Sequence, residues 1–510
     1  MKPRATFLAL CLAAAGLLSQ PASAEEITVA VGSGFTTLDP YDATDMLSRT
    51  VVKSFYEGLF MFDQNMKPVP QLAESYETSP DGLVYTIKLR PNVKFHDGTT
   101  FDAEAVKLNI DRLLDPANHL SRRTYFTPIE KVEVADPLTV RITLKHPLGT
   151  FLSRLANGTV QMVCPSLLKS GKDVAFNACG TGPYVLKDYN PSERLYVVKN
   201  PNYRVAGLPK LDGILWRPVV ENSTRAAMVR TGEAQFAHPM PAEQIKVLQN
   251  DPKIDILVQP SVIIRYLFIN NLQKPFTDVR VRQAINYAIN KEALAKVAFS
   301  GYARPVTGVV PEVFEFATKL GPWPYDPKKA RELLKEAGYT QGFETVLWSG
   351  YNNTTGQKVI QFIQQQLRQV GIRTTLRSLE AGQRVALVES VQDPMKAGMR
   401  LYYIGWSNST GEIDLAMRPL FHSESWAPAL ANEGFYKNEK VDRLLDEAIA
   451  EPDKAKRAKL YEEVQSTIWN DAPWAFLVTE DVTGASVKTL KNFRLRPDSS
   501  YDFYEAELVK

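Results

Sequence analysis

The spacing of apolar residues changes from a period of two to a helical period within residues 85–106. Apolar side chains first occupy every second position, which predicts a half-buried strand. Pro91 ends this strand because it has no N–H to donate to a sheet, and Asp97 with Gly98 predicts a tight turn. Asp102 then precedes apolar residues at helical spacing and is the expected helix cap. The apolar positions of the predicted strand and helix are Tyr85, Ile87, Leu89, Val106, Ile110, Leu113 and Leu114.

The second half of the chain contains the clearest helical patterns. Asp326 followed by Pro327 predicts a helix start, and Gly338 predicts its end. A Gln-rich amphipathic segment, 358–370, is predicted to stop at Gly371. Short strand patterns alternate with these helices, which indicates α/β or α+β architecture. Two more helices are predicted to begin at Asp278 and Asp453, and the first strand of the chain is predicted at Glu26–Val31.

The first 24 residues have the pattern of a secretory signal peptide. Lys2 and Arg4 precede the apolar run Ala5–Leu18, and the small residues before Glu25 predict cleavage after Ala24. The alternative, a membrane anchor, requires a longer apolar run to span a bilayer. Cleavage lowers the formal net charge from +3 to +1, so no basic surplus indicates a nucleic-acid partner. We therefore expect an exported mature chain of ordinary globular composition, 44% hydrophobic and 23% charged for the full sequence.

The mature chain keeps two cysteines, Cys164 and Cys179. Export places them in an oxidising compartment, where an even number of cysteines favours a disulfide. This disulfide would close a loop of about 15 residues, worth roughly 3 kcal/mol in the chain-entropy description. The alternative is two buried free thiols.

The motifs of common enzyme classes do not occur in the sequence. The five histidines lack metal-ligand spacing, and neither His-Glu-x-x-His nor Gly-x-Ser-x-Gly is present. Residues 180–182, Gly-Thr-Gly, suggest a phosphate loop, but Pro183 removes a backbone donor there. A turn before a strand is the preferred interpretation. We expect no metal and no cofactor, and an exported hydrolase with converging carboxylates is kept as a disfavoured alternative.

Five segments of the sequence match motifs of one protein family. The strongest covers residues 94–106, with Lys-Phe-His-Asp-Gly-Thr followed by Phe-Asp-Ala-Glu-Ala-Val. The sequence resembles the peptide and nickel solute-binding proteins of ABC importers over essentially the whole mature chain. Within this family it is most similar to the glutathione-binding members, in segments 35–43, 222–228, 322–327 and 405–412. Besides residues 94–106, the segments that carry the resemblance to the whole family are 180–184, 274–284, 325–334 and 404–406.

The resemblance implies an α/β, bilobed periplasmic binding protein with an extra domain on lobe I and a two-strand hinge. The chain is expected to cross between lobes near Leu267–Asn271 and Phe476–Thr483, and the lobes to close on a ligand. It implies a monomer that captures glutathione in the periplasm and delivers it to the permease subunits of an importer, without catalysis. The implied domains are lobe I at 25–58, 180–267 and 483–510, the extra domain at 59–179, and lobe II at 268–482.

Glutathione carries one ammonium, two carboxylates and a thiol, and each charge needs a partner in a dry cleft. Dipeptide-binding relatives hold the ammonium with an Asp three residues after a Gly-Trp pair, a position that is Ser409 in this sequence. Glu412 or Asp414, on the same loop, is the expected replacement. The alternatives are helix capping for Asp414 and a structural role for Glu412.

The same relatives bind the peptide carboxylate with an Arg at a position that is Gly350 in this sequence. Arg265 is the first candidate instead, because it lies in a strongly apolar strand and needs an anionic partner. Its alternative is a buried salt bridge within the protein. Arg384 is the second candidate, with a solvated helix position as its alternative. Further expected contacts are the hydroxyls of Thr36 and Thr37, the amide of Asn352 and the ring of Trp406.

Other functions remain open at this stage. Another short peptide or peptide-like solute, such as an opine, would need the same charged partners. A receptor that only signals would also bind a solute between two lobes.

Overall fold

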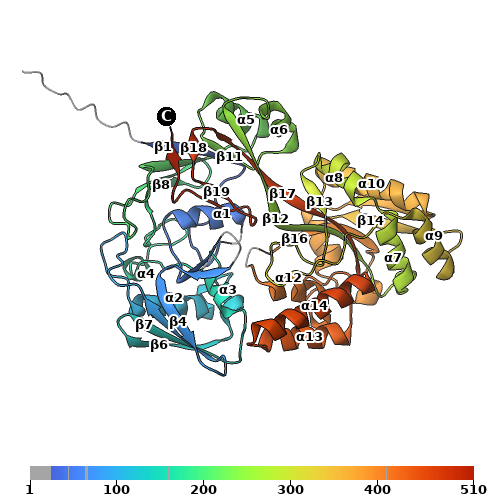
Figure 1. Cartoon of the computed structure of the whole chain (residues 1–510), viewed down its shortest axis with the longest axis horizontal. Helices are drawn as coiled ribbons and strands as arrows, with labels where there is room; N and C mark the ends of the chain where they lie inside the picture. Colours follow the sequence, from blue (N-terminus) through green and yellow to red (C-terminus); the bar gives the residue numbers. More distant parts are fainter. Residues whose placement is uncertain (1–24, 44, 64–66, 159, 409–410, 510) are drawn as a thin grey trace, which may run out of the picture.

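The computed structural model shows two lobes joined by two long strands (Figure 1). These strands, β12 (Ile254–Ile269) and β17 (Trp474–Val487), pair in antiparallel fashion and belong to one 11-stranded sheet that runs through both lobes. We call the half that contains β1 lobe I and the half that contains β16 lobe II. The predicted signal peptide, 1–24, lies outside the described residues. The structure describes residues 25–43, 45–63, 67–158, 160–408 and 411–509.

The long sheet has the order β15-β14-β16-β12-β17-β11-β1-β10-β9-β8, with β13 paired to β17. The register of β12 against β17 shifts between Pro260 and Ile264, so the strand pair is irregular near its middle. The predicted first strand is confirmed as β1. The strands are β1 Glu26–Val31, β2 Phe60–Phe62, β3 Pro68–Pro70, β4 Ala73–Thr78, β5 Val84–Leu89, β6 Ile129–Asp136, β7 Thr139–Leu144, β8 Tyr184–Asn190, β9 Arg194–Lys199, β10 Gly213–Pro218, β11 Phe236–His238, β12, β13 Ala303–Pro305, β14 Phe343–Ser349, β15 Ile372–Ser378, β16 Leu401–Ser407, β17, β18 Leu490–Lys491, β19 Arg494–Leu495, β20 Tyr501–Asp502 and β21 Glu507–Leu508.

The helices confirm the predicted starts at four aspartates. In each case an Asp side chain accepts a hydrogen bond from a backbone N–H of the first turn, as an N-cap does. The Gln-rich helix begins earlier than predicted, at Thr354, because the side chain of Asn353 caps it and accepts from Gly356 N at 2.8 Å. In the described part of the chain, no helix is both long and apolar enough for a membrane crossing. The α-helices are α1 Met46–Val51, α2 Ala103–Leu114, α3 Phe151–Ala156, α4 Pro165–Lys169, α5 Asn222–Thr231, α6 Ala242–Leu248, α7 Val279–Ala288, α8 Lys291–Phe299, α9 Pro327–Glu336, α10 Thr354–Gln369, α11 Ala381–Arg384, α12 Ile413–Phe421, α13 Glu439–Ala450 and α14 Lys454–Asp471.

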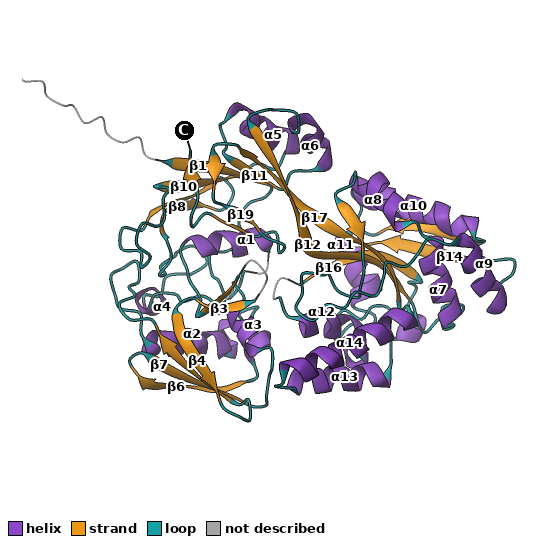
Figure 2. Cartoon of the chain, viewed as in Figure 1, coloured by secondary structure: helices purple, strands orange, loops and turns teal. Residues whose placement is uncertain are grey.

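Lobe II places helices on both faces of its half of the sheet (Figure 2). One apolar cluster contains side chains of α7, α8, α9 and α10, and a second contains side chains of α12, α13 and α14. Alternate residues of β16 therefore enter different cores: Tyr402 packs in the second cluster and Tyr403 in the first.

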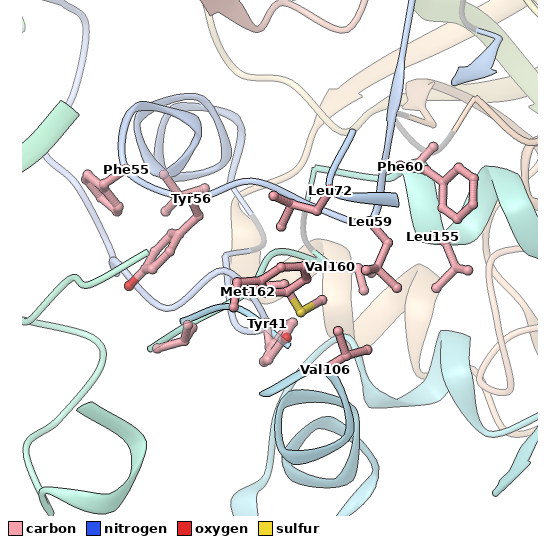
Figure 3. Packing of buried hydrophobic residues seen from close by; sticks show 14 of the residues in the cluster. Tyr41, Phe55, Tyr56, Leu59, Phe60, Leu72, Val106, Leu155, Val160 and Met162 are labelled. Carbon is pink, nitrogen blue, oxygen red and sulfur yellow. The ribbon is translucent and has the colours of Figure 1, made fainter. Parts of the chain in front are cut away.

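A second, four-stranded antiparallel sheet, β4-β5-β7-β6, lies with α2 inside residues 59–179. This region contains the strand, turn and helix predicted for residues 85–114. The Asp102 side chain accepts a hydrogen bond from Ala105 N at 2.9 Å. Its core is continuous with that of lobe I. Figure 3 shows Tyr56, Leu72, Val106 and Met162 packed in this shared core. The sheet is therefore anchored to lobe I.

The Gly-Thr-Gly segment is a turn before β8, as predicted, rather than a phosphate loop. A Cβ on Gly180 would lie 2.1 Å from the carbonyl oxygen of Phe55, and one on Gly182 would lie 2.6 Å from the Phe55 carbonyl carbon. The Gly182 N–H donates to the same Phe55 oxygen at 3.1 Å. Both glycines are therefore needed because two backbone segments pass in contact.

Cys164 and Cys179 form the predicted disulfide, with their Cα atoms 5.4 Å apart. The N–H of Cys164 also donates to the carbonyl oxygen of Cys179 at 2.8 Å. The bridge therefore closes the segment that leads from α4 back to lobe I.

Candidate functional site

The strand directions make the carboxyl ends of both half-sheets point toward the other lobe. β12 runs from lobe I into lobe II, and β11 runs in the same direction because both strands are antiparallel to β17. β1 and β10 are parallel to β11, whereas β16 is antiparallel to β12 and runs back toward lobe I. β14 and β15 are parallel to β16. Ligands of open α/β sheets bind beyond such carboxyl ends, so the space between the lobes is the candidate site.

A cavity of about 350 Å³ lies at the lobe I edge, where β1 and β11 end. This volume falls within the range of about 300–1,000 Å³ that is typical of small-molecule sites. Val31, Ser33 and His238 line the cavity, with Asp45 at the start of α1. Burial lowers the pKa of His238 to about 4, and its Nδ1 lies 3.0 Å from the carbonyl oxygen of Thr483 in β17. The imidazole is therefore neutral at physiological pH.

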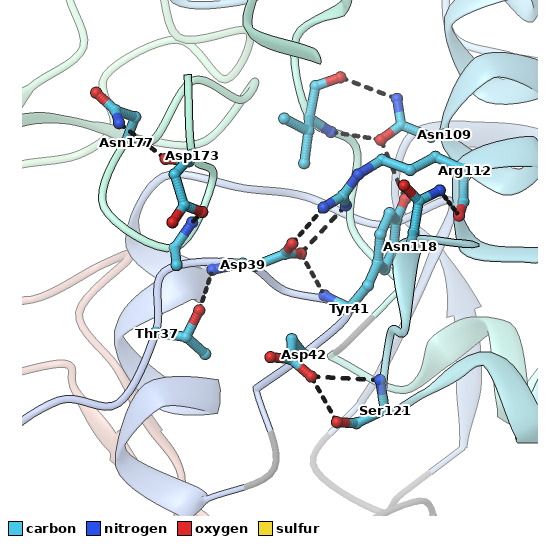
Figure 4. Close-up of polar contacts among 12 residues, drawn as sticks. Thr37, Asp39, Tyr41, Asp42, Asn109, Arg112, Asn118, Ser121, Asp173 and Asn177 are labelled. Carbon is cyan, nitrogen blue, oxygen red and sulfur yellow. Dashed lines mark hydrogen bonds and ion pairs between the residues drawn. The ribbon is translucent and has the colours of Figure 1, made fainter. Parts of the chain in front are cut away.

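The predicted Thr36 and Thr37 lie in the loop after β1, but both hydroxyls have partners inside lobe I. The hydroxyl of Thr36 donates to the carboxylate of Asp45. The hydroxyl of Thr37 accepts from the N–H of Asp39 at 3.0 Å (Figure 4). The Asp39 carboxylate is in turn paired with Arg112.

Basic side chains concentrate in a second cavity of about 60 Å³ beside α1, which Arg49, Lys53 and Arg496 line together with Asp498. Lys53 Nζ donates to Ser500 Oγ at 2.8 Å. Burial lowers the pKa of both Arg49 and Lys53, and the charge of Arg122 lowers the pKa of Arg49 further. Asp502 also lines this cavity and pairs with Arg496 at 2.7 Å, and Asp498 lies 4.0 Å from Lys53 Nζ, so basic and acidic groups are paired within lobe I.

Arg265 lies in β12 at the lobe II edge and has an anionic partner in the protein. Its Nε donates to the Glu480 carboxylate at 2.8 Å, and its Nη1 donates to the Tyr351 hydroxyl at 2.5 Å. Burial lowers the pKa of Arg265, but Glu480, Tyr351 and Tyr403 together outweigh this effect, so the pKa is raised overall. A Cβ on Gly405 would lie 2.4 Å from Arg265 Nη1, so the glycine of the Gly-Trp pair makes room for this guanidinium. The salt bridge that the sequence left open as an alternative is present.

Asn352 and Arg384 follow β14 and β15 at the same edge. Asn352 Nδ2 donates to Glu380 Oε1 at 3.0 Å. Arg384 Nε lies 2.7 Å from Glu389 Oε1, at the other end of the π-helix Val385–Glu389. Two predicted side chains are thus at the cleft edge, each bound to a carboxylate of lobe II.

The two acidic candidates are also paired. Glu412 precedes α12 and is 2% exposed, and it accepts from Arg154 Nε of α3 at 3.0 Å. Asp414 is fully buried in the first turn of α12 and accepts from Arg418 Nε at 2.9 Å. Ser409 lies outside the described residues. Each of the two carboxylates is thus already neutralised by an arginine of the protein.

Trp406 lies near the end of β16 and packs close to Val262, Phe314 and Trp474, with no space between them for a water molecule. Its Nε1 is buried and has no hydrogen-bond partner in the described ranges. An indole N–H can only donate, and a ligand oxygen could reach it only if the packed side chains around it moved.

The sequence reasoning missed Arg154, Arg49 and Lys53. Arg154 had a recognisable signal, because it interrupts the apolar residues of α3 and needs an anion there. Arg49 and Lys53 had none, since single basic residues in a short helical segment are ordinary at a surface.

Comparison with known proteins agrees with this geometry. A profile of the bacterial extracellular solute-binding proteins, family 5, matches residues 67–428. The glutathione-binding protein GsiB of Pectobacterium atrosepticum is 51% identical over 498 residues, which cover 97% of each chain. The structure of DppA from Helicobacter pylori in complex with the peptide STSA is similar, with a TM-score of 0.76, 28% identity, and coverage of 95% of this chain and 98% of that one.

The structure of HbpA2 from Haemophilus parasuis shows the same fold, with a TM-score of 0.84, 24% identity, and coverage of 95% of this chain and 100% of that one. The predicted α/β periplasmic binding protein fold is thus confirmed. The profile match and the relative that aligns over the full length show that the chain belongs to the family 5 bacterial extracellular solute-binding proteins.

Proposed function

We propose that this chain binds glutathione between its lobes and delivers it to the permease subunits of an ABC importer. The observation that carries the proposal is the 51% identity to GsiB over 97% of both chains. The family consists of solute-binding proteins, so the chain is a carrier and not an enzyme.

The basic side chains at the lobe II edge suit the carboxylates of a zwitterionic ligand. Arg265 and Arg384 lie there, and a ligand carboxylate would share each guanidinium with Glu480 or Glu389. Charge-assisted hydrogen bonds of this kind contribute about 1.5–3 kcal/mol each. The ligand contacts named from the sequence stay predictions: Thr36, Thr37, Arg265, Asn352, Arg384, Trp406, Glu412 and Asp414.

We also propose that the lobes close by bending at β12 and β17. The register shift between Pro260 and Ile264 supports a hinge there, since an irregular strand pair has lost part of its ladder. This position precedes the crossing predicted near Leu267–Asn271. The proposed domain boundaries are otherwise those of the sequence, with the extra domain at 59–179.

We place the mature protein in the periplasm, exported by a signal peptide that is cleaved after Ala24. The membership of an extracellular family supports export. Mass spectrometry of the mature protein would check the cleavage, because the intact chain would then begin at Glu25.

Isothermal titration calorimetry of the mature protein with reduced glutathione tests the function. We expect one saturable site with a dissociation constant near or below micromolar, or about 8 kcal/mol of binding free energy. Free glutamate and glycylglycine are the controls, since each carries only part of the charge pattern. Absence of binding to glutathione would overturn the proposal.

A second candidate is a carrier for other short peptides or peptide-like solutes. Solved relatives at 28% and 25% identity are complexes with the peptide STSA and with agropinic acid, which favours this class of ligand. A thermal-shift screen separates the two candidates, because a ligand present well above its dissociation constant raises the melting temperature. A shift with peptides or opines but none with glutathione would favour the second candidate.

A further inference from the structure

Asp45 is a carboxylate at the lobe I edge whose partners are neutral hydrogen-bond donors. It precedes α1 and lines the cavity of about 350 Å³ where β1 and β11 end. Its Oδ1 accepts from Ser48 N at 2.8 Å, and the Thr36 hydroxyl donates to its Oδ2. Burial raises the pKa of Asp45, but these hydrogen bonds outweigh it and lower the pKa overall, so the group is ionised at pH 7.

Three other acidic side chains near the cleft are each bound to an arginine. The pairs are Glu412 with Arg154, Asp414 with Arg418, and Glu480 with Arg265. A ligand ammonium would have to compete with the arginine at each of these carboxylates. At Asp45 no cation has to leave first, since among the described residues its side chain is held by Ser48 and Thr36.

Tyr501 brings a second polar group to the same cavity. It is 2% exposed, and its hydroxyl has no hydrogen-bond partner among the residues that the structure describes. Burial raises the pKa of Tyr501 far above its usual range, so the side chain stays a neutral phenol. An unpaired hydroxyl in the interior is costly, so this position calls for a polar group of a ligand.

His238 supplies a third acceptor. It ends β11, lines the cavity, and its ring centroid lies 5.3 Å from that of Tyr501. Because Nδ1 lies 3.0 Å from the carbonyl oxygen of Thr483, the neutral ring carries its proton on Nδ1 and leaves Nε2 as an acceptor. The cavity therefore offers a carboxylate, a phenol oxygen and an imidazole nitrogen to one ligand.

These three acceptors match the chemistry of a primary ammonium group. An ammonium has three N–H donors and no acceptor, and its bond to a carboxylate is stronger than a hydrogen bond between neutral groups. Among the described residues that line this cavity, Asp45 is the one charged side chain. Arg49 of the same helix lines the second cavity instead. The charge of Asp45 would repel a ligand carboxylate, so this cavity favours the ammonium end of a zwitterion.

We propose that Asp45 accepts the ammonium group of the bound solute, with Tyr501 and His238 as the other two acceptors. This inference rests on the proposed function, because it assigns one charge of the proposed ligand. Thr36 then acts through Asp45 as a positioning residue, since its hydroxyl holds the carboxylate. The ammonium would thus be bound by lobe I, and not by the loop that follows Trp406 in lobe II.

The test compares glutathione with its deaminated analogue, glutaryl-cysteinylglycine, by calorimetry at pH 7. We expect the wild type to bind glutathione at least about tenfold more tightly than the analogue, because only glutathione has the ammonium. D45N should lose most of this preference. Its affinity for the analogue should change less than about threefold, because asparagine caps a helix as well as aspartate does. Y501F, which removes one acceptor, should reduce the preference partly.

D102N is the matched control. Asp102 caps α2 by accepting from Ala105 N at 2.9 Å, with the same three-residue spacing as Asp45 and Ser48. The substitution therefore removes the charge of an N-cap in the extra domain and keeps the cap. We expect D102N to keep the affinity and the preference of the wild type.

Each outcome has a distinct meaning. If the wild type does not bind glutathione, the proposed function fails, and this inference fails with it. If the wild type binds glutathione but D45N keeps its preference over the analogue, only the role of Asp45 is overturned. An equal loss of affinity for both ligands in D45N also overturns it, because the residue would then be purely structural. Should D45N fail to fold, D45S repeats the test, since serine also caps a helix without a charge.

Discussion

Arg154 and Glu412 form a buried ion pair that joins the two lobes. The two residues are 258 positions apart in the chain. Their Nε and Oε2 atoms are 3.0 Å apart, and the side chains are 9% and 1% exposed. Close by in the chain, Gly149 N donates to the carbonyl oxygen of Ile449 at 3.1 Å. The lobes are therefore in contact through α3 and α12 as well as through the hinge strands.

Removing one member of this pair should be strongly destabilising. In R154M the Glu412 carboxylate stays buried without its cation, a change that costs about 3–5 kcal/mol. The double variant R154M/E412L should recover most of this loss, because neither charge remains. Urea unfolding of the wild type, R154M, E412L and the double variant measures the coupling. R373A, which breaks the exposed pair with Glu344, is the control and should cost less than about 1 kcal/mol. Additive effects of R154M and E412L would contradict the pairing.

Features that depend on neighbouring residues could be predicted from the sequence. Asp102, Asp326 and Asp453 each precede a helix, and each caps it as expected, because a cap needs only a backbone N–H two or three residues away. Pro327 and Gly338 mark the ends of one helix for equally local reasons. α10 begins four residues before the predicted start, because the cap at Asn353 is followed by polar residues that hide the helical period.

Partners that are distant in the sequence could not be predicted. Arg265 needed an anion, but the sequence could not decide between a ligand and Glu480, which lies 215 positions later. Glu412 was likewise a candidate for the ligand ammonium, although Arg154 of another domain neutralises it.

Replacement of Arg265 tests whether it binds the ligand as well as Glu480. We expect R265A to weaken glutathione binding at least tenfold, because one ligand carboxylate loses a charge-assisted donor. Calorimetry measures the affinity, and a melting curve measures the stability of the same sample. R304A, which breaks the ion pair with Asp481 near the hinge, is the control and should leave affinity unchanged. Lower stability with unchanged affinity would make Arg265 a purely structural residue.

Protonation of His238 should destabilise the protein in acid. Burial depresses its pKa from 6.5 to about 4, so the unfolded chain binds a proton more readily than the folded one. The stability that it contributes is fully present above pH 6.5 and is lost as the pH falls toward 4, by about 3 kcal/mol in total. Urea unfolding from pH 8 to pH 4 measures this loss. H238N, whose amide can replace the Nδ1 donor to Thr483, should flatten the profile between pH 6.5 and 4. The exposed His146, changed to Asn, should leave the profile as it is; an equal effect of both variants would contradict the assignment.

Gly180 should not tolerate a side chain, although its backbone is not in the left-handed region. An added Cβ would lie 2.1 Å from the Phe55 carbonyl oxygen and 2.4 Å from a ring carbon of Tyr56, both held in the core of lobe I. Overpacking of this kind costs about 1–3 kcal/mol. We therefore expect G180A to lower the free energy of unfolding by that amount. G382A is the control, since a Cβ there meets no atom within 4 Å and its helical position makes alanine neutral or favourable. Equal stability of the two variants, measured by urea unfolding, would show that the turn can move away from Phe55 and that the close approach does not require glycine.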